Sequence, residues 1–433
     1  MKNSKPAGTS VPVKLSTAVM GLGQIVQKQF VKGGLYLLAL CAFVSYLVTG
    51  GVSDIKGFFT LGTVKGDAWL GIEGDDSIMM MLKGILAFII IAAFILLYIS
   101  NLRDVRESAG KLEKGETLPA FPEALKQFFD RKFYKAALTL PVAGVLVFSI
   151  LPIVFMILIA FTDYGGEIVP PELVSWIGLG NFKKILGLGN IKDTFVKILG
   201  WNFIWAVCAT FLNYFGGLGL ALLLNKKCVK GKTFWRSFPI LAYAVPGFIT
   251  LLGFKFMFSY GGPINYYITL FGRNAVGFLD IDAGIKAKLI GLLVNAWISV
   301  PTSMLLATGI LSNMNADLYD AASIDGASSF KQFTKITLPF VVFSTTPVLI
   351  TSFVGNFNNF GIFYFLRGGL YQDGYFLASD TDLLINWLYN LSIANNYYSI
   401  GAAISLIIFV ITSLISLTVY VRSNAYRKED TFR

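Results

Sequence analysis

Three asparagines, Asn356, Asn358 and Asn359, lie within four residues of one another inside an apolar segment of the chain. Amides are costly in apolar surroundings unless they form hydrogen bonds. A single amide would fit a hydrogen bond between two helices, which is worth about 0.6 kcal/mol in a membrane. Three exceed what helix packing usually needs, and Phe357 and Phe360 alternate with them. Amides beside aromatic faces suit a neutral polyhydroxylated ligand such as a sugar.

Two earlier segments offer side chains of the same chemistry. Asn295 and Ser299 are four residues apart and therefore share one helix face, with Thr302 near the same face. Tyr243, in the preceding apolar segment, adds a ring that carries a hydroxyl. If these segments pack together, their polar groups can converge on one ligand. The alternative is that the amides only join helices to one another.

A second candidate is the polar stretch from Asp320 to Gly326, which continues to Pro339. Asn315 can cap a first helix, Gly326 suits the left-handed residue that ends it, and Ser328 can cap a second helix. The sequence therefore predicts a helix–turn–helix between two apolar segments. By itself such a unit is also compatible with a passive linker.

Residue types that most enzymes need are scarce. The chain has no histidine and only three cysteines, so no Ser–His–Asp, Cys–His or zinc constellation is expected. Gly231-Lys-Thr233 resembles the end of a P-loop, but Lys226 stands where that loop needs a glycine. We therefore expect no catalytic residue, metal or cofactor in this chain. Buried carboxylates typical of ion-driven transporters are also lacking, which disfavours a secondary transporter.

Composition places these residues in a polytopic membrane protein. Of 433 residues 55% are hydrophobic, and mean hydropathy is +0.66. Recurring apolar runs predict an all-α protein with about eight transmembrane helices. The expected spans are 34–51, 80–100, 137–161, 199–224, 237–258, 287–313, 338–362 and 400–421.

The net charge of +11 fits basic cytoplasmic loops rather than binding to nucleic acid. Basic residues concentrate at both ends and in every second loop, which predicts that both termini are cytoplasmic. The loop 162–198, predicted to be outside, carries four lysines and departs from this pattern. We expect three regions: a basic cytoplasmic segment 1–32 whose part from Val13 to Val31 lies along the membrane surface, two helices with a charged loop in 33–135, and a six-helix core in 136–433.

The polar stretch resembles the coupling loop of permease subunits in binding-protein-dependent ABC importers. That family's signature is Glu-Ala-Ala, a glycine four residues later, and Ile-x-Leu-Pro after nine more. The matching residues here are Asp320, Ala321, Ala322, Gly326, Ile336, Leu338 and Pro339. Asp320 departs from the usual glutamate but keeps its charge. The resemblance implies that the loop 314–338 contacts a cytoplasmic ATPase, which binds ATP and Mg²⁺ in place of this chain.

Further motifs resemble the larger permease subunit of maltose and maltodextrin importers, from about the third span onwards. They are Tyr243-Ala-Val-Pro-Gly247, Asn295-Ala-Trp297, Gly355-Asn-Phe-Asn-Asn-Phe360 and Thr381-Asp-Leu-Leu384. The resemblance implies a sugar site halfway across the membrane. Its contacts would be Tyr243, Gly247, Asn295, Ile298, Ser299, Thr302, Asn356 and Asn359.

The resemblance also implies the partners: a second, smaller permease subunit, two cytoplasmic ATPases and an oligosaccharide substrate. The short loop 162–198 resembles Gram-positive versions, in which the sugar receptor is an extracellular lipoprotein. The expected function is import of maltose or maltodextrin across the bacterial plasma membrane. Galacto-oligosaccharides or raffinose-like sugars remain alternatives, as do an ion-coupled transporter and a membrane scaffold without transport.

Overall fold

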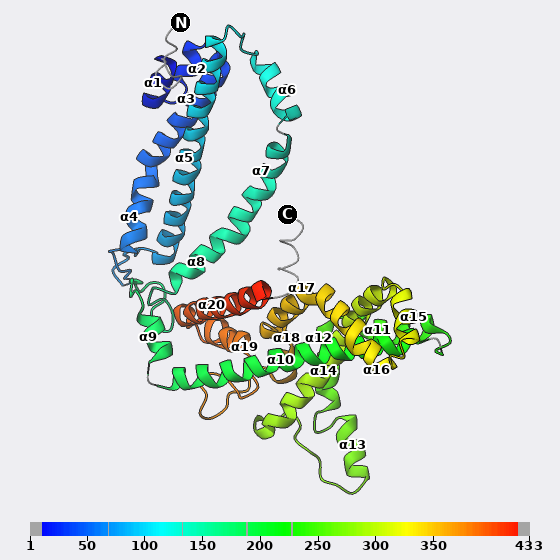
Figure 1. Cartoon of the computed structure of the whole chain (residues 1–433). Helices are drawn as coiled ribbons and strands as arrows, with labels where there is room; N and C mark the ends of the chain where they lie inside the picture. Colours follow the sequence, from blue (N-terminus) through cyan, green and yellow to red (C-terminus); the bar gives the residue numbers. More distant parts are fainter. Residues whose placement is uncertain (1–10, 68, 132, 188, 227, 423–433) are drawn as a thin grey trace. The chain divides into compact units, whose positions relative to one another are not determined.

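The computed structural model describes residues 11–422 apart from 68, 132, 188 and 227 (Figure 1). Its named elements are all helical, with isolated β-bridges in the loops. This confirms the predicted all-α class. Some of the basic residues expected at the two ends lie outside the described residues: Lys2, Lys5, Arg427, Lys428 and Arg433.

The predicted membrane spans correspond to long apolar helices. Seven described helical segments are long and apolar enough to cross a membrane, and one bent pair gives an eighth. They are Phe30–Thr60, Ser77–Glu113, Ala137–Ile159, Asn190–Asn225, the pair Lys232–Ala244 and Gly247–Met257, Ile281–Ser312, Ser329–Arg367 and Tyr398–Arg422. Each overlaps one predicted span, so the prediction of about eight is confirmed.

The chain packs as two compact units, residues 1–178 and 179–433. The expected division into two extra helices and a six-helix core from residue 136 stays a prediction. The first unit contains α1 (Val11–Ala18), α2 (Leu22–Val26), α3 (Phe30–Tyr46), the π-helix η2 (Leu47–Gly51), α4 (Val52–Thr60), α5 (Ser77–Glu113), α6 (Phe121–Arg131), α7 (Phe133–Val145), the π-helix η3 (Leu146–Ile150) and α8 (Leu151–Ile159).

In the first unit α4 lies close against α5 (Figure 1). Gly84 permits this approach, because a Cβ atom there would lie 2.4 Å from the Phe58 side chain. The segment expected along the membrane surface forms α1 and α2 and packs on the end of α5. Its buried Gln24 donates to Asn101 Oδ1 (2.8 Å) and accepts from the Ser16 hydroxyl (3.1 Å).

The second unit holds the remaining helices. They are α9 (Gly180–Leu186), α10 (Asn190–Asn225), α11 (Lys232–Ala244), α12 (Gly247–Met257), α13 (Pro263–Leu270), the 3₁₀ helix η4 (Ile281–Ala283), α14 (Gly284–Ser312), α15 (Asp317–Ile324), α16 (Ser329–Gln332), the π-helix η5 (Phe333–Thr337), α17 (Leu338–Phe357), α18 (Phe360–Arg367), α19 (Leu384–Tyr389), the π-helix η6 (Asn390–Ala394) and α20 (Tyr398–Arg422).

Helices α10 and α14 form the centre of this unit (Figure 1). Gly217 on α10 faces Ser303 of α14 so closely that an added Cβ would lie 2.4 Å away. Small residues let membrane helices approach in this way. Trp205 and Phe363 pack edge to face beside them, with ring centroids 5.0 Å apart. The pair α10 and α14 therefore supplies a rigid frame for side chains between the helices.

Two spans of this unit are interrupted. Helices α11 and α12 meet at an angle of 91° around Val245 and Pro246. Proline disfavours helical geometry in the residue before it, which explains the break. Between α17 and α18 the chain turns at Asn358, and the Asn359 side chain caps α18 by accepting from Ile362 N (3.3 Å). Such breaks occur where backbone lines a cavity or is buried in protein.

Candidate functional site

A cavity of about 360 Å³ lies within the second unit, where α10, α11, α14 and α17 converge. Helix α14 contributes Ile298, Ser299, Thr302 and Ser303, and α11 contributes Tyr243 at the break before α12. None of the residues that line the cavity carries a charge. The walls therefore offer hydroxyls, amides and apolar surface, which is chemistry for a neutral polar ligand.

Hydrogen bonds among three asparagines and a threonine link α10, α14, α17 and the start of α18 beside this cavity. Asn359 Nδ2 donates to Asn295 Oδ1 (3.1 Å), and Asn295 Nδ2 donates to Asn356 Oδ1 (3.4 Å). Asn356 Nδ2 in turn donates to Thr210 Oγ1 on α10 (3.0 Å). Trp205 Nε1 adds a bond to the Asn356 carbonyl (3.1 Å). The asparagines thus hold the helices together, and Asn356 and Asn359 also face the cavity. Part of their role is therefore structural.

The residues expected at the sugar site are largely brought together. Six of the eight line the cavity: Tyr243, Ile298, Ser299, Thr302, Asn356 and Asn359. Asn295 does not line it but lies directly behind, 4% exposed and bonded to two of the lining asparagines. Gly247 opens α12 just after the bend and is not among the lining residues.

Asn358 takes a different role from its two neighbours. Its side chain is exposed and donates to the Val354 carbonyl one turn earlier (3.1 Å). Because the chain turns there, Asn358 ends α17, whereas Asn356 and Asn359 face the cavity.

Sequence reasoning missed the wall formed by α10. Thr210, Asn213 and Tyr214 line the cavity from this helix, and Ser352 does so from α17. The Tyr214 hydroxyl is bonded to Thr345 Oγ1 (2.7 Å). The spacing of Thr210 and Asn213, three apart within an apolar span, was the available signal.

The larger hollow on the first unit lacks such chemistry. It measures about 470 Å³ and is lined by residues of the first span alone, from Leu40 to Thr49. Its lining is almost entirely apolar. It is therefore an open groove on one apolar helix, without the converging polar groups of the second unit.

The predicted helix–turn–helix is present as α15 and α16. The Asn315 side chain accepts from Asp317 N (3.0 Å), and the Ser328 side chain caps α16 by accepting from Lys331 N (3.4 Å). Gly326 adopts φ = +74°, a left-handed conformation that glycine takes without strain. The two helices are tied by Gln332 Nε2, which donates to Ser323 Oγ (2.9 Å).

One surface of the helix–turn–helix formed by α15 and α16 is exposed. Leu318, Ile324 and Phe330 are 53%, 87% and 75% exposed. Asp320 is exposed too and makes no ion pair with another described residue. Behind this surface, the Tyr319 hydroxyl bonds to Thr337 Oγ1 (2.8 Å) and so fixes α15 against the start of the next span. An ordered element with exposed apolar residues is typical of a docking surface.

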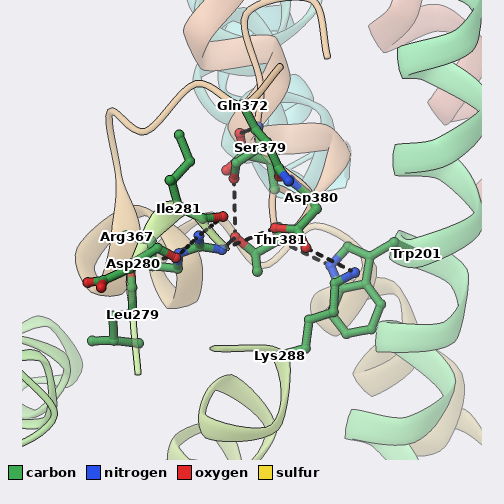
Figure 2. A network of polar contacts seen from close by, with 11 residues as sticks. Trp201, Leu279, Asp280, Ile281, Lys288, Arg367, Gln372, Ser379, Asp380 and Thr381 are labelled. Carbon is green, nitrogen blue, oxygen red and sulfur yellow. Dashed lines mark hydrogen bonds and ion pairs between the residues drawn. The ribbon is translucent and has the colours of Figure 1, made fainter. Parts of the chain in front are cut away.

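A buried ion network lies between α10, α14 and the segment after α18 (Figure 2). The Arg367 guanidinium donates to Asp380 Oδ1 (3.2 Å), to Thr381 Oγ1 (2.7 Å) and to the carbonyls of three residues. These residues are Leu279, Asp280 and Ile281. Lys288 Nζ lies 3.8 Å from Asp380 Oδ2 and over the ring of Trp201. Thr381 belongs to a motif noted in the sequence, but the ion network itself was not predicted, because Arg367 and the carbonyls that it contacts are 86 to 88 residues apart.

Asp382 lies beside this network and is 7% exposed. Its Oδ2 accepts from Ser379 N (2.9 Å) and from Asn390 Nδ2 (3.4 Å). Burial raises the pKa of the Asp382 carboxyl to about 6, although the hydrogen bonds from Ser379 and the charge of Arg367 oppose that rise. The network therefore anchors the segment between α18 and α20, which lies in the loop expected at 363–399.

Among the described residues no three His, Cys, Asp or Glu side chains are grouped as metal ligands would be. The geometry is that of a binding site between helices, with a separate ordered element that presents an open surface.

Comparison with known proteins shows which family has this sequence and fold. Residues 215–425 match the model of the binding-protein-dependent transport system inner membrane component family. The maltodextrin transport system permease protein MdxF of Bacillus subtilis (strain 168) is 34% identical over 96% of both chains. The galactooligosaccharides transport system permease protein GanP of the same strain is 32% identical over 96% of this chain and 98% of its own.

The fold is shared with a solved structure. A chain of a bacterial ABC transporter involved in the import of the acidic polysaccharide alginate aligns with a TM-score of 0.57 at 20% identity. The alignment covers 69% of this chain and 97% of that one. Because of its 34% identity with MdxF and its match to the family model, the protein belongs to the family of binding-protein-dependent transport system inner membrane components, and it is a multi-pass, non-catalytic permease subunit of an ABC transporter.

Proposed function

We propose that this permease imports a neutral oligosaccharide, and that the cavity between α10, α11, α14 and α17 is where the sugar crosses. One observation carries the proposal: about 360 Å³ of space is walled by hydroxyls, amides and the Tyr243 ring, with no charged residue. An acidic sugar would meet no countercharge there, whereas neutral hydroxyls find both donors and acceptors. The cited relatives from Bacillus subtilis are named as permeases for maltodextrin and galactooligosaccharides, which are both neutral sugars.

Maltodextrin is the first candidate for the cargo. The relative named for maltodextrin is slightly more similar than the one named for galactooligosaccharides, at 34% against 32% identity. That margin is small, so galacto-oligosaccharides are the second candidate. In either case the contacts are Tyr243, Ile298, Ser299, Thr302, Asn356 and Asn359, with Asn295 holding the two asparagines in place.

The open surface of α15 and α16 is proposed to dock on a cytoplasmic ATPase. Support comes from the exposed Ile324 and Phe330, from the unpaired Asp320, and from the rigid turn at Gly326. Ala321 and Ala322 leave room for close approach on this helix. Tyr319 links the docking helix to Thr337 at the start of α17, the helix that carries Asn356. Movement of α15 would therefore displace α17 and the sugar-site residue Asn356 on it.

The assembled importer is proposed to contain a second, smaller permease subunit, two ATPases and an extracellular sugar-binding lipoprotein. Both termini of this chain would lie in the cytoplasm, as the distribution of basic residues predicts. ATP binding closes the ATPase pair and turns the cavity outward, and the receptor then delivers the sugar. Such alternating access is a two-state equilibrium that ATP and the receptor bias.

Uptake by the reconstituted importer tests this function. We expect ATP-dependent uptake of radiolabelled maltotriose, competed by unlabelled maltodextrins and less well by galactotriose. The reverse order of competition would favour the second candidate. Uptake that persists without the ATPase and responds to an ion gradient would instead show a secondary transporter and refute the proposal.

A further inference from the structure

The amide of Asn213 stands out because no described residue forms a hydrogen bond with its buried oxygen. Asn213 is 6% exposed and lines the cavity from α10. Its Oδ1 atom is buried and has no hydrogen-bond partner among the described residues. Buried amides are nearly always hydrogen-bonded, because leaving one unpaired is costly. A polar residue kept in this state next to a cavity therefore points to a partner from outside the chain.

The other asparagines of the site are in the opposite situation. Asn356 donates to Thr210 and accepts from Asn295, so both ends of its amide are engaged within the protein. On α10 itself, the fully buried Asn202 donates to the Phe357 carbonyl (3.1 Å) and accepts from Leu384 N (2.9 Å). These amides hold helices together. Asn213 has the same chemistry and similar burial, but its side chain forms no hydrogen bond to another helix within the described ranges.

A second group with unused hydrogen-bonding capacity, the Thr210 hydroxyl, lies one turn before Asn213. Thr210 Oγ1 accepts from Asn356, while no acceptor for its own hydroxyl proton is found in the described part of the chain. Residues three apart lie on the same face of a helix. Thr210 and Asn213 therefore present a hydroxyl donor and a free amide side by side on the cavity wall.

We propose that Asn213, together with Thr210, forms a subsite on α10 that binds hydroxyls of the transported sugar and contributes to its selection. This inference rests on the proposed function. A hydroxyl both donates and accepts, so one sugar hydroxyl can donate to the Asn213 carbonyl oxygen while a neighbour accepts from the Asn213 amide or the Thr210 hydroxyl. Asn356 and Asn359 then hold the helices together as well as facing the sugar, and the α10 pair adds free hydrogen-bonding capacity.

Replacing Asn213 by leucine in the reconstituted importer tests the subsite, with Asn202→Leu as the matched control on the same helix. Removing a group that is already unpaired in the protein does not weaken the fold, so Asn213→Leu should melt no lower than wild type. It should raise the maltotriose concentration for half-maximal uptake about fivefold to tenfold. Asn202→Leu should lower the melting temperature, because it leaves Phe357 O and Leu384 N without partners.

Asn213→Ser provides a second variant of smaller volume, in which one hydroxyl replaces the amide. It should show an intermediate rise in half-maximal concentration and unchanged melting. Wild-type half-saturation in both variants would overturn the subsite, and so would a fall in melting temperature like that of Asn202→Leu. Failure of the proposed function is distinguishable, because the wild-type importer would then show no ATP-dependent uptake of maltotriose or galactotriose.

Discussion

Replacing Asp382 by asparagine should stabilise the protein at neutral pH and have little effect near pH 4. Burial raises the pKa of this carboxyl from 3.8 to about 6. Because the folded-state pKa is higher than the unfolded one, the stabilising contribution of the bound proton is fully present below about pH 4 and is lost as the pH rises through 6. At 1.36 kcal/mol per pKa unit, the loss is about 3 kcal/mol.

The asparagine variant is neutral at every pH and can still accept from Ser379 N and Asn390 Nδ2, so it avoids that loss. Thermal melting of the purified permease between pH 4 and 8 measures the difference. The variant should gain several degrees over wild type as the pH rises from 4 to 7. Asp380→Asn is the control, because it breaks the ion pair with Arg367 and should melt lower than wild type at pH 7. Parallel melting curves for wild type and Asp382→Asn would refute the reasoning.

Three other substitutions probe separate parts of the chain. Arg367→Met leaves Asp380 and three carbonyls without their donor, so stability should fall by about 3–5 kcal/mol; unchanged melting would contradict this. Asp320→Lys should abolish uptake while the protein still reaches the membrane, and wild-type transport would exclude docking through Asp320. Thr302→Tyr places a ring in the cavity and should shorten the longest maltodextrin that is taken up, as tested with maltotriose to maltoheptaose. An unchanged length range would show that Thr302 does not limit the space.

Hydrophobic runs were sufficient to predict the membrane spans, because each span must satisfy its own backbone in a helix and therefore stands out by length and composition. The break at Pro246 was also foreseeable from local chemistry. The segment 368–398 was not, because its order comes from Arg367 and Asp380. Their partners are Lys288 of α14 and the carbonyls of residues 279–281 just before it. A local sequence pattern cannot indicate contacts between segments so far apart in the chain.

The site was partly predictable for a similar reason. Clustered asparagines and their helical spacing, with the family resemblance, pointed to residues that the fold brings to one cavity. Sequence could not separate Asn356, which faces the cavity, from Asn358, which ends a helix, because the turn between α17 and α18 decides their directions. It also could not single out Asn213, since an isolated amide in a glycine-rich span resembles a packing residue until its lack of a partner is visible.

Maltotriose uptake by the complete importer carrying Asn356→Leu together with Asn359→Leu tests the central claim most directly. If the cavity between α10, α11, α14 and α17 is where the sugar crosses, the double variant should lose ATP-dependent uptake while the permease still assembles with its ATPase. Unchanged uptake kinetics in the assembled variant would contradict the account and move the sugar pathway away from this cavity.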